Sequence, residues 1–204
     1  ERRVVLEPAC GHAPFLAGAM RLLRELFEGD EKAFHKYAKR NLIGIETDSF
    51  ACEIARLSLT MADVPNRNGW NILDADIYHG DVLSRKAKEA MILLCNPPFE
   101  NFTPKKQDDP RAAEEQPKFC SKAAEMLWRT LPYMPERSVF GVILPRVFLH
   151  SKNISELRET ILRDFELSQI CTLPENVFTF ASHMSVLLLG RKKTARSESI
   201  IDNE

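Results

Sequence analysis

Apolar residues along the chain follow two alternating patterns, which predict strands and helices. Short apolar runs predict seven β-strands, at residues 4–6, 42–45, 72–77, 91–95, 138–144, 166–173 and 184–189. Apolar residues spaced three or four positions apart predict helices over residues 15–27, 51–61, 121–131 and 151–164. The alternation is typical of a doubly wound α/β sheet, in which helices cross between parallel strands.

Two features of the sequence refine the prediction of this sheet. The run 91–95 is continuously apolar, which is typical of a parallel strand covered by helices on both faces. The connector between the last two strands is too short for a crossover helix, so these strands are expected to form an antiparallel excursion at one edge. The pattern therefore predicts a mostly parallel, seven-stranded sheet with an antiparallel edge strand.

Domain boundaries follow from the polar segments. Residues 100–117 combine prolines with many charges, a pattern that predicts a long loop of the kind that is commonly functional. Residues 191–204 form a polar tail. We therefore predict one domain over residues 1–190, and because the chain starts with Glu1 just before an apolar run, we expect it to be part of a longer protein.

Composition narrows the class of protein. The chain has 204 residues, of which 44% are hydrophobic and 28% charged, as in ordinary soluble domains. No apolar run approaches the roughly 20 residues of a membrane-spanning helix. Five scattered cysteines without C-x-x-C spacing, and histidines that lack ligand spacing, predict a reduced, metal-free, cytoplasmic protein.

The charge balance bears on nucleic-acid binding. The formal net charge is -1, which is unexpected for a protein that binds nucleic acid alone, because phosphates are neutralised by concentrated Lys and Arg. Either the basic residues are clustered locally or a partner supplies the contacts.

Candidate site residues lie where the predicted strands end, because ligands of such sheets bind beyond the carboxyl ends of the strands. After the first strand stand Glu7-Pro8-Ala9-Cys10-Gly11, a turn that brings bare backbone and a helix N-terminus near a ligand. The second and third glycines of the dinucleotide fingerprint are missing, which weakens a phosphate interpretation. Acidic Glu7 suits a cationic ligand better, such as the sulfonium and amino groups of S-adenosylmethionine.

Two further acids follow the next two strands. Glu46 can accept hydrogen bonds from a ribose diol, as acids at that position do in nucleoside-binding sheets. Asp81 can accept from the amine of the cofactor's adenine. Each alone could be a solvated loop carboxylate, but three acids at the ends of successive strands favour a nucleoside cofactor.

Asn96-Pro97-Pro98-Phe99 is the most specific feature of the chain. Two prolines remove successive backbone donors and leave the Asn96 side-chain oxygen and the Pro97 carbonyl as acceptors for an amino group. An aromatic amine is a poor nucleophile; accepting its two hydrogens directs its lone pair and disperses developing positive charge. Phe99 can stack on the base. In isolation the tetrapeptide could be a strand-ending turn; its position favours catalytic roles for Asn96, Pro97 and Phe99.

With these segments in view, the sequence resembles the N6-adenine DNA methyltransferases, and more closely the modification subunits of type I restriction-modification systems and related fused type II enzymes. The resemblance covers nearly the whole chain. Its segments are Val5-Leu6-Glu7-Pro8-Ala9-Cys10-Gly11 with Phe15-Leu16, Gly44-Ile45-Glu46, Gly80-Asp81, Asn96-Pro97-Pro98-Phe99, Ile143-Leu144-Pro145 and Leu173-Pro174-Glu175-Asn176-Val177-Phe178. The cofactor motif precedes the catalytic motif, which is similar to the gamma arrangement of this family.

The resemblance implies a Rossmann-like class I methyltransferase fold and a catalytic core that uses S-adenosyl-L-methionine, with S-adenosyl-L-homocysteine as product. It implies methyl transfer to N6 of an adenine flipped out of double-stranded DNA. Phe178, or Phe180, matches the region of a second aromatic against the base. It also implies a partner, either a specificity subunit or a fused target-recognition domain. Ala13 departs from the family, which has glycine there.

Two other functions remain open. A methyltransferase of the same fold can act on a protein glutamine or on an RNA base amine, although such relatives more often have tyrosine at the position of Phe99. A non-enzymatic alternative is a cofactor-binding module whose catalytic parts have decayed, against which the intact Asn96–Phe99 motif argues.

Overall fold

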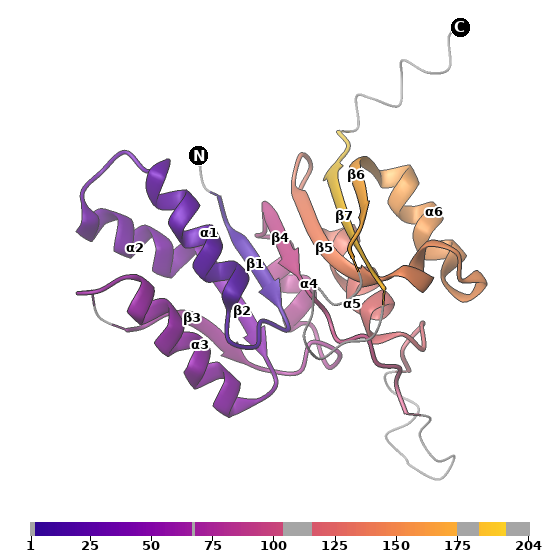
Figure 1. The fold of residues 1–204 in the computed structure, drawn as a ribbon, viewed down its shortest axis with the longest axis horizontal. Coiled ribbons are helices and arrows are strands. Elements are labelled where there is room, and N and C mark those ends of the chain that lie inside the picture. Colours follow the sequence, from indigo (N-terminus) through magenta and orange to yellow (C-terminus); the bar gives the residue numbers. More distant parts are fainter. Residues whose placement is uncertain (1–2, 67, 104–115, 175–183, 195–204) are drawn as a thin grey trace, which may run out of the picture.

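The computed structural model describes residues 3–66, 68–103, 116–174 and 184–194. Seven strands form one sheet in the order β3-β2-β1-β4-β5-β7-β6 (Figure 1). Neighbouring strands from β3 to β5 are parallel, and β7 is antiparallel to both β5 and β6. From β1 the chain first adds strands on one side of the sheet, β2 and β3, and then crosses to the other side of β1 to add β4. Doubly wound sheets bind their ligands at such a switch point.

The strands agree closely with the apolar runs. They are β1 (Val5–Pro8), β2 (Leu42–Glu46), β3 (Asn71–Asp74), β4 (Ile92–Cys95), β5 (Val139–Pro145), β6 (Phe165–Thr172) and β7 (Ser185–Lys192). The predicted mostly parallel α/β fold, with an antiparallel element at one edge, is confirmed. The reversed strand is β7, which lies between β5 and the edge strand β6.

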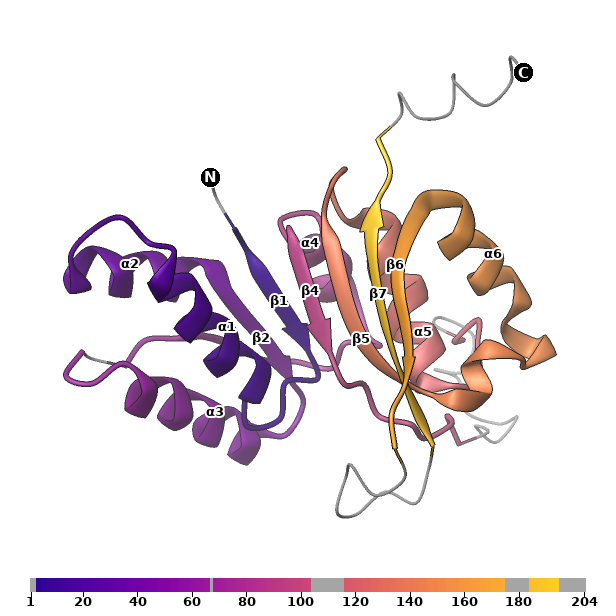
Figure 2. The same cartoon turned by 45° about the horizontal axis from the view of Figure 1, so that its top comes forward.

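Helices fill the connections. They are α1 (Pro14–Glu25), α2 (Glu31–Asn41), α3 (Ser49–Ala62), α4 (Val82–Ala87), α5 (Lys122–Thr130) and α6 (Ser155–Asp164), with 3-10 turns at Leu131–Tyr133, Arg146–Leu149 and Lys152–Ile154. Helices α1 to α3 pack on one face of the sheet, and α4 to α6 on the other (Figure 2). In the described part of the chain, no helix combines the length and apolarity that crossing a membrane requires.

The sequence prediction missed helices α2 and α4 and misplaced the ends of strands β3 and β7. Helix α2 was not predicted, although the Asp30 side chain caps it by accepting from the Ala33 N–H at 2.7 Å. Strand β3 ends at Asp74 instead of residue 77, and α4 replaces the expected loop that follows. Strand β7 reaches Lys192, whose ammonium group donates to the Pro132 and Met134 carbonyls at 2.8 and 2.6 Å. Two residues of the predicted tail therefore belong to the sheet.

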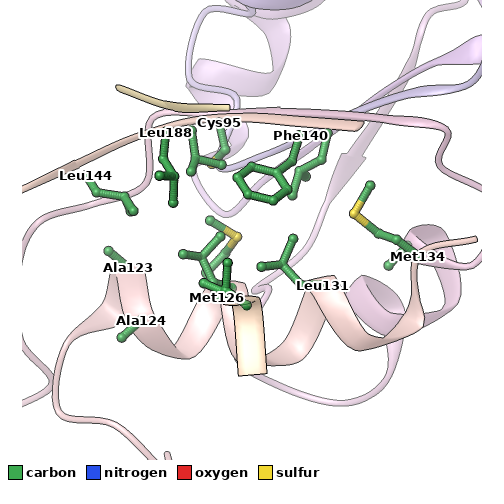
Figure 3. Close-up of a cluster of buried hydrophobic side chains, with 14 of the residues drawn as sticks. Cys95, Ala123, Ala124, Met126, Leu131, Met134, Phe140, Leu144 and Leu188 are labelled. Atoms are coloured by element: carbon green, nitrogen blue, oxygen red, sulfur yellow. The ribbon is translucent and has the colours of Figure 1, made fainter. Parts of the chain in front are cut away.

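The sheet separates two apolar cores. One lies between the strands and α4 to α6 and includes Cys95, Phe140 and Leu188, which face Met126 of α5 (Figure 3). The other lies under α1 to α3. Together the cores hold the strands rigidly, so the loops at the carboxyl ends of β1 to β4 have fixed relative positions.

Candidate active site

A cavity of about 560 Å³ lies at the carboxyl ends of β1 to β4. Its volume is within the usual range for small-molecule sites, roughly 300–1,000 Å³. The residues that line it come from five segments, and they are Ala9, Gly11, Ile45, Glu46, Thr47, Ala75, Asp76, Ile77, Tyr78, His79, Asn96, Pro98, Phe102 and Lys122. The structure therefore brings the predicted residues Ala9, Gly11, Glu46 and Asn96 to one cavity.

The loop from β1 to α1 forms one wall. Ala9, Gly11 and Ala13 all have positive φ, at 56°, 51° and 59°. For alanine this left-handed conformation costs roughly 1–2 kcal/mol, so the surrounding contacts must hold the loop in place. They include bonds from the Cys10 N–H to the Ile45 carbonyl at 2.9 Å and from the Gly11 N–H to Glu46 at 2.8 Å. A Cβ built on Gly11 would meet no atom within 4 Å, so the loop opens onto free space.

Glu7 lies beneath this loop and does not line the cavity. Its side chain is buried, and Oε2 accepts the Leu16 N–H at 3.0 Å, which fixes the start of α1. Burial raises the pKa of Glu7 to about 8, although hydrogen bonds from the Leu16 and Phe15 backbone oppose the shift. In this structure Glu7 therefore supports the loop, whereas the sequence placed it against a cationic ligand.

Pro8 and Cys10 also support the loop from below. The Pro8 carbonyl accepts a hydrogen bond from the Cys95 thiol at 2.8 Å, which connects β1 to β4. The Cys10 side chain is buried between the loop and β2, where a Cβ on Gly44 would lie 2.8 Å from its Sγ. Neither residue lines the cavity.

Glu46 joins the ends of β1 and β2. Its Oε1 accepts the N–H groups of Thr47 and Asp48 at 2.8 and 3.1 Å, and its Oε2 accepts that of Gly11. A carboxylate offers about four lone-pair positions, so three bonds leave one on Oε2. The sequence suggested that Glu46 accepts both hydroxyls of a diol; the geometry favours a single bond to Oε2.

The structure does not bring Asp81 to the cavity. Its side chain is 71% exposed and pairs with Arg85 at 3.1 Å on α4. Because β3 ends at Asp74, the segment after it forms the cavity wall, and Asp76 stands where Asp81 was expected. Asp76 accepts the Tyr78 N–H at 2.8 Å and contacts the His79 ring nitrogen at 2.7 Å. The sequence missed Asp76 because it lay within the predicted strand.

Beyond β4, Asn96 is exposed and lines the cavity, Pro97 is buried and Phe99 is half-buried. Phe99 is not among the lining residues. Phe102 lines the cavity instead, edge-on to Tyr78 with ring centroids 4.9 Å apart. Neither Tyr78 nor Phe102 was predicted. The feature of the sequence that could have identified Phe102 is its position three residues after Phe99.

A short antiparallel β-bridge between residues 101 and 121 holds Phe102 beside Tyr78. Backbone bonds run from Phe102 N–H to the Cys120 carbonyl at 2.8 Å and from Lys122 N–H to the Glu100 carbonyl at 3.0 Å. The Lys122 ammonium also pairs with Glu100 at 2.7 Å, which lowers the pKa of that carboxyl. The segment after Phe99 is thereby held against the start of α5.

Two predicted features remain outside these observations. Phe178 and its alternative, Phe180, lie outside the described residues, as do most of the residues of the predicted long loop. Among the described residues, no group of three or more His, Cys, Asp or Glu side chains could hold a metal ion.

Comparisons with known proteins give the family and the fold. Residues 1–203 match the family model described as N-6 DNA Methylase. No curated protein sequence matches significantly.

Among solved structures, the M protein of the type I restriction enzyme EcoKI is 20% identical, with a TM-score of 0.72 over 96% of this chain and 41% of that one. The type I methyltransferase subunit from Streptococcus thermophilus is also 20% identical, with a TM-score of 0.68 over 96% and 41%. The Type ISP enzyme LlaBIII bound to DNA is 12% identical, with a TM-score of 0.72 over 96% and 17%. The chain thus spans about two fifths of the length of the type I subunits that it matches.

Proposed function

The chain belongs to the N-6 DNA methylase family, and we propose that it is the catalytic core of an enzyme that methylates N6 of a flipped-out adenine in double-stranded DNA. The observation that carries the proposal is the position of Asn96, which opens into the same cavity as Gly11 and Glu46. An amide suited to binding an amine and a carboxylate suited to binding a nucleoside therefore face one cavity.

The residues present fit S-adenosyl-L-methionine as the cofactor. Open space at Gly11 admits a ligand close to the backbone, and the remaining lone pair on Glu46 Oε2 suits a ribose hydroxyl. Tyr78 and Phe102 offer an apolar wall for the adenine ring. When bound, the cofactor supplies an electrophilic methyl group and leaves as S-adenosyl-L-homocysteine. Asp76, which lines the cavity, would accept from the amine of the cofactor's adenine, the role that the sequence suggested for Asp81.

Asn96 and Pro97 act on the target adenine. The Asn96 side-chain oxygen and the Pro97 carbonyl accept the two N6 hydrogens, which holds the nitrogen lone pair out of conjugation with the ring. As the nitrogen becomes positive, these preorganised acceptors stabilise the charge. Phe99, with Phe178 as a second candidate, stacks on the flipped base and offsets part of the cost of unstacking.

We also propose that DNA recognition depends on a specificity subunit or a fused target-recognition domain, as part of a restriction-modification system. The net charge of -1 supports this dependence, because a core without a basic excess gains little affinity from phosphates.

Asn96→Ala tests the function. In the assembled protein we expect methyl transfer from labelled S-adenosyl-L-methionine to duplex DNA to fall by about 10²–10³-fold, the usual loss when one preorganised transition-state partner is removed. Cofactor affinity should stay nearly unchanged. Asn153→Ala, at an exposed position on the turn before α6, is the matched control. Label that appears only in protein or RNA would contradict the proposal.

A further inference from the structure

Helix α5 holds the part of the cavity wall that follows β3. Tyr78, which lines the cavity, is bonded to this helix at two points. Its phenol donates to the Lys122 carbonyl at 3.1 Å, and its backbone carbonyl accepts from Arg129 Nη1 at 2.7 Å, about two helical turns further along. Burial raises the pKa of Tyr78, so the phenol stays protonated and remains a donor. Both the side chain and the backbone of Tyr78 are therefore fixed to one helix.

The Arg129 guanidinium is itself held by a buried carboxylate. Arg129 Nε donates to Glu125 Oε1 at 2.6 Å, and the other Glu125 oxygen accepts the Phe119 N–H at 3.0 Å. The Glu125 side chain is 2% exposed and that of Arg129 is 21% exposed. Burying an ion pair costs free energy that only good geometry and further hydrogen bonds offset. These bonds give the guanidinium one fixed position from which it donates to Tyr78.

Helix α5 is a rigid support for this contact. On its apolar face Ala123, Met126 and Leu127 are fully buried, and Met126 faces the core side chains of the sheet (Figure 3). The helix also begins beside the bridge that holds Phe102. Tyr78 and Phe102, which come from segments after different strands, are thus both attached to α5.

The segment that carries Tyr78 lies between two regular elements. It follows the end of β3 at Asp74 and precedes the start of α4 at Val82. Residues 75–79 all line the cavity, and within them Asp76 accepts the Tyr78 N–H at 2.8 Å. When an irregular segment is ordered before its ligand arrives, binding avoids part of the entropy cost of ordering it. The contacts with α5 therefore bear on the affinity of the cavity for its ligand.

We propose that Glu125 and Arg129 are positioning residues for the cofactor. Arg129 fixes the Tyr78 backbone, and the Tyr78 N–H in turn fixes Asp76, so the pair sets the place of both residues against the adenine of S-adenosyl-L-methionine. Neither Glu125 nor Arg129 lines this cavity, so both act through Tyr78 and not by contact with the ligand. The inference rests on the proposed function, because it assigns the cavity to that cofactor.

Arg129→Lys tests this role. It keeps a positive charge beside Glu125 but removes the forked guanidinium, whose two bonds a single ammonium group does not replace. In the assembled protein we expect the Kd for S-adenosyl-L-methionine, measured by calorimetry, to rise about 10-fold, because binding must then order the wall segment. The kcat for methylation of duplex DNA at saturating cofactor should stay within about 2-fold. Amide hydrogen exchange at residues 76–79 should be faster in the cofactor-free variant than in the wild type.

Arg56→Lys is the matched control. Arg56 lies on α3 with a side chain that is 24% exposed, and it also joins a glutamate of its own helix, Glu53, to a backbone carbonyl, that of Ile72 at 2.6 Å. Ile72 belongs to β3 and does not line the cavity. This variant should lose a similar amount of thermal stability, yet its cofactor Kd should change by less than about 2-fold.

Tyr78→Phe removes the other bond to α5 and keeps the aromatic ring. Because both bonds hold the same residue, the double variant Tyr78→Phe, Arg129→Lys should raise the Kd by more than the product of the two single effects. If Arg129→Lys does not fold, the double variant Glu125→Gln, Arg129→Gln removes both charges of the pair together, and the same increase in Kd is expected.

Three results would overturn the inference while leaving the proposed function intact. They are an unchanged Kd in Arg129→Lys, an equal increase of the Kd in Arg56→Lys, and a fall in kcat at constant Kd, which would connect the pair to the DNA substrate instead. Failure of the wild-type protein to bind S-adenosyl-L-methionine would contradict the proposed function itself, and this inference with it.

Discussion

At the β1–β2 end of the cavity, backbone and carboxylate groups are bonded to one another, whereas the β4 end presents an exposed Asn96 and a half-buried Phe99. Glu46 alone holds three backbone N–H groups. The first end is organised before any ligand arrives, as suits a small cofactor. The second end is open, as suits a bulky substrate that must enter and leave. The difference implies that substitutions at the β1–β2 end change the cofactor Kd, whereas substitutions at the β4 end change kcat/KM for DNA.

Among substitutions at the β1–β2 end of the cavity, Glu46→Ala should weaken cofactor binding most. It leaves the N–H groups of Gly11, Thr47 and Asp48 without this acceptor, and each unsatisfied donor costs about 1–3 kcal/mol. We expect the cofactor Kd, measured by calorimetry, to increase about 10–100-fold and the protein to lose stability. Glu159→Ala, exposed on α6, is the control. An unchanged Kd would remove Glu46 from the cofactor site.

Glu7→Gln should change how stability depends on pH. The pKa of Glu7 in the folded protein is about 8, above the ordinary value of 4.5, so its stabilising contribution is complete below pH 4.5 and is lost as pH rises through 8. Between pH 5 and 8.5 the wild-type free energy of unfolding should fall by roughly 1–4 kcal/mol more than that of the variant. Urea unfolding at both pH values measures this. Parallel pH profiles would place Glu7 in a more polar environment.

Phe99→Ala should impair only the use of DNA, because Phe99 lies at the β4 end of the cavity. Loss of stacking on the flipped adenine costs about 1–3 kcal/mol, so kcat/KM for DNA should fall about 5–150-fold while the cofactor Kd stays constant. Phe102→Ala, which removes a lining residue beside Tyr78, should instead weaken cofactor binding. If both variants changed the same constant, the division of the cavity into two ends would be wrong.

Ala13→Gly should have the smallest effect of these substitutions, a small change in the stability of the protein. Glycine removes the strain at φ 59°, worth roughly 1–2 kcal/mol, but it also loses a buried methyl group worth about 0.8 kcal/mol and gains flexibility in the unfolded chain. The net change in stability, measured by thermal unfolding, should stay below about 1 kcal/mol. A larger loss would show that the methyl group is essential to the packing of the loop.

Where the sequence signal was local, the structure brings the predicted residues to one cavity. Ala9, Gly11, Glu46 and Asn96 follow apolar runs directly, and they line the cavity. Asp81 lies away from the cavity because the apolar residues Ile72, Leu73 and Ile77 extended the predicted strand past its true end at Asp74. Tyr78, Phe102 and Lys122 were missed because only the bridge between residues 101 and 121 brings them to the same wall.

The sequence by itself determined the succession of the seven strands along the chain, the reversed strand near one edge and the position of the Asn96 motif after β4, because these depend on local periodicity, on connector length and on proline. Only the tertiary structure decided that Glu7 supports the loop and that Asp76, not Asp81, lines the cavity. Burial and hydrogen bonding join residues that are distant in the chain. A linear pattern records that a side chain is apolar or acidic, but not what covers it.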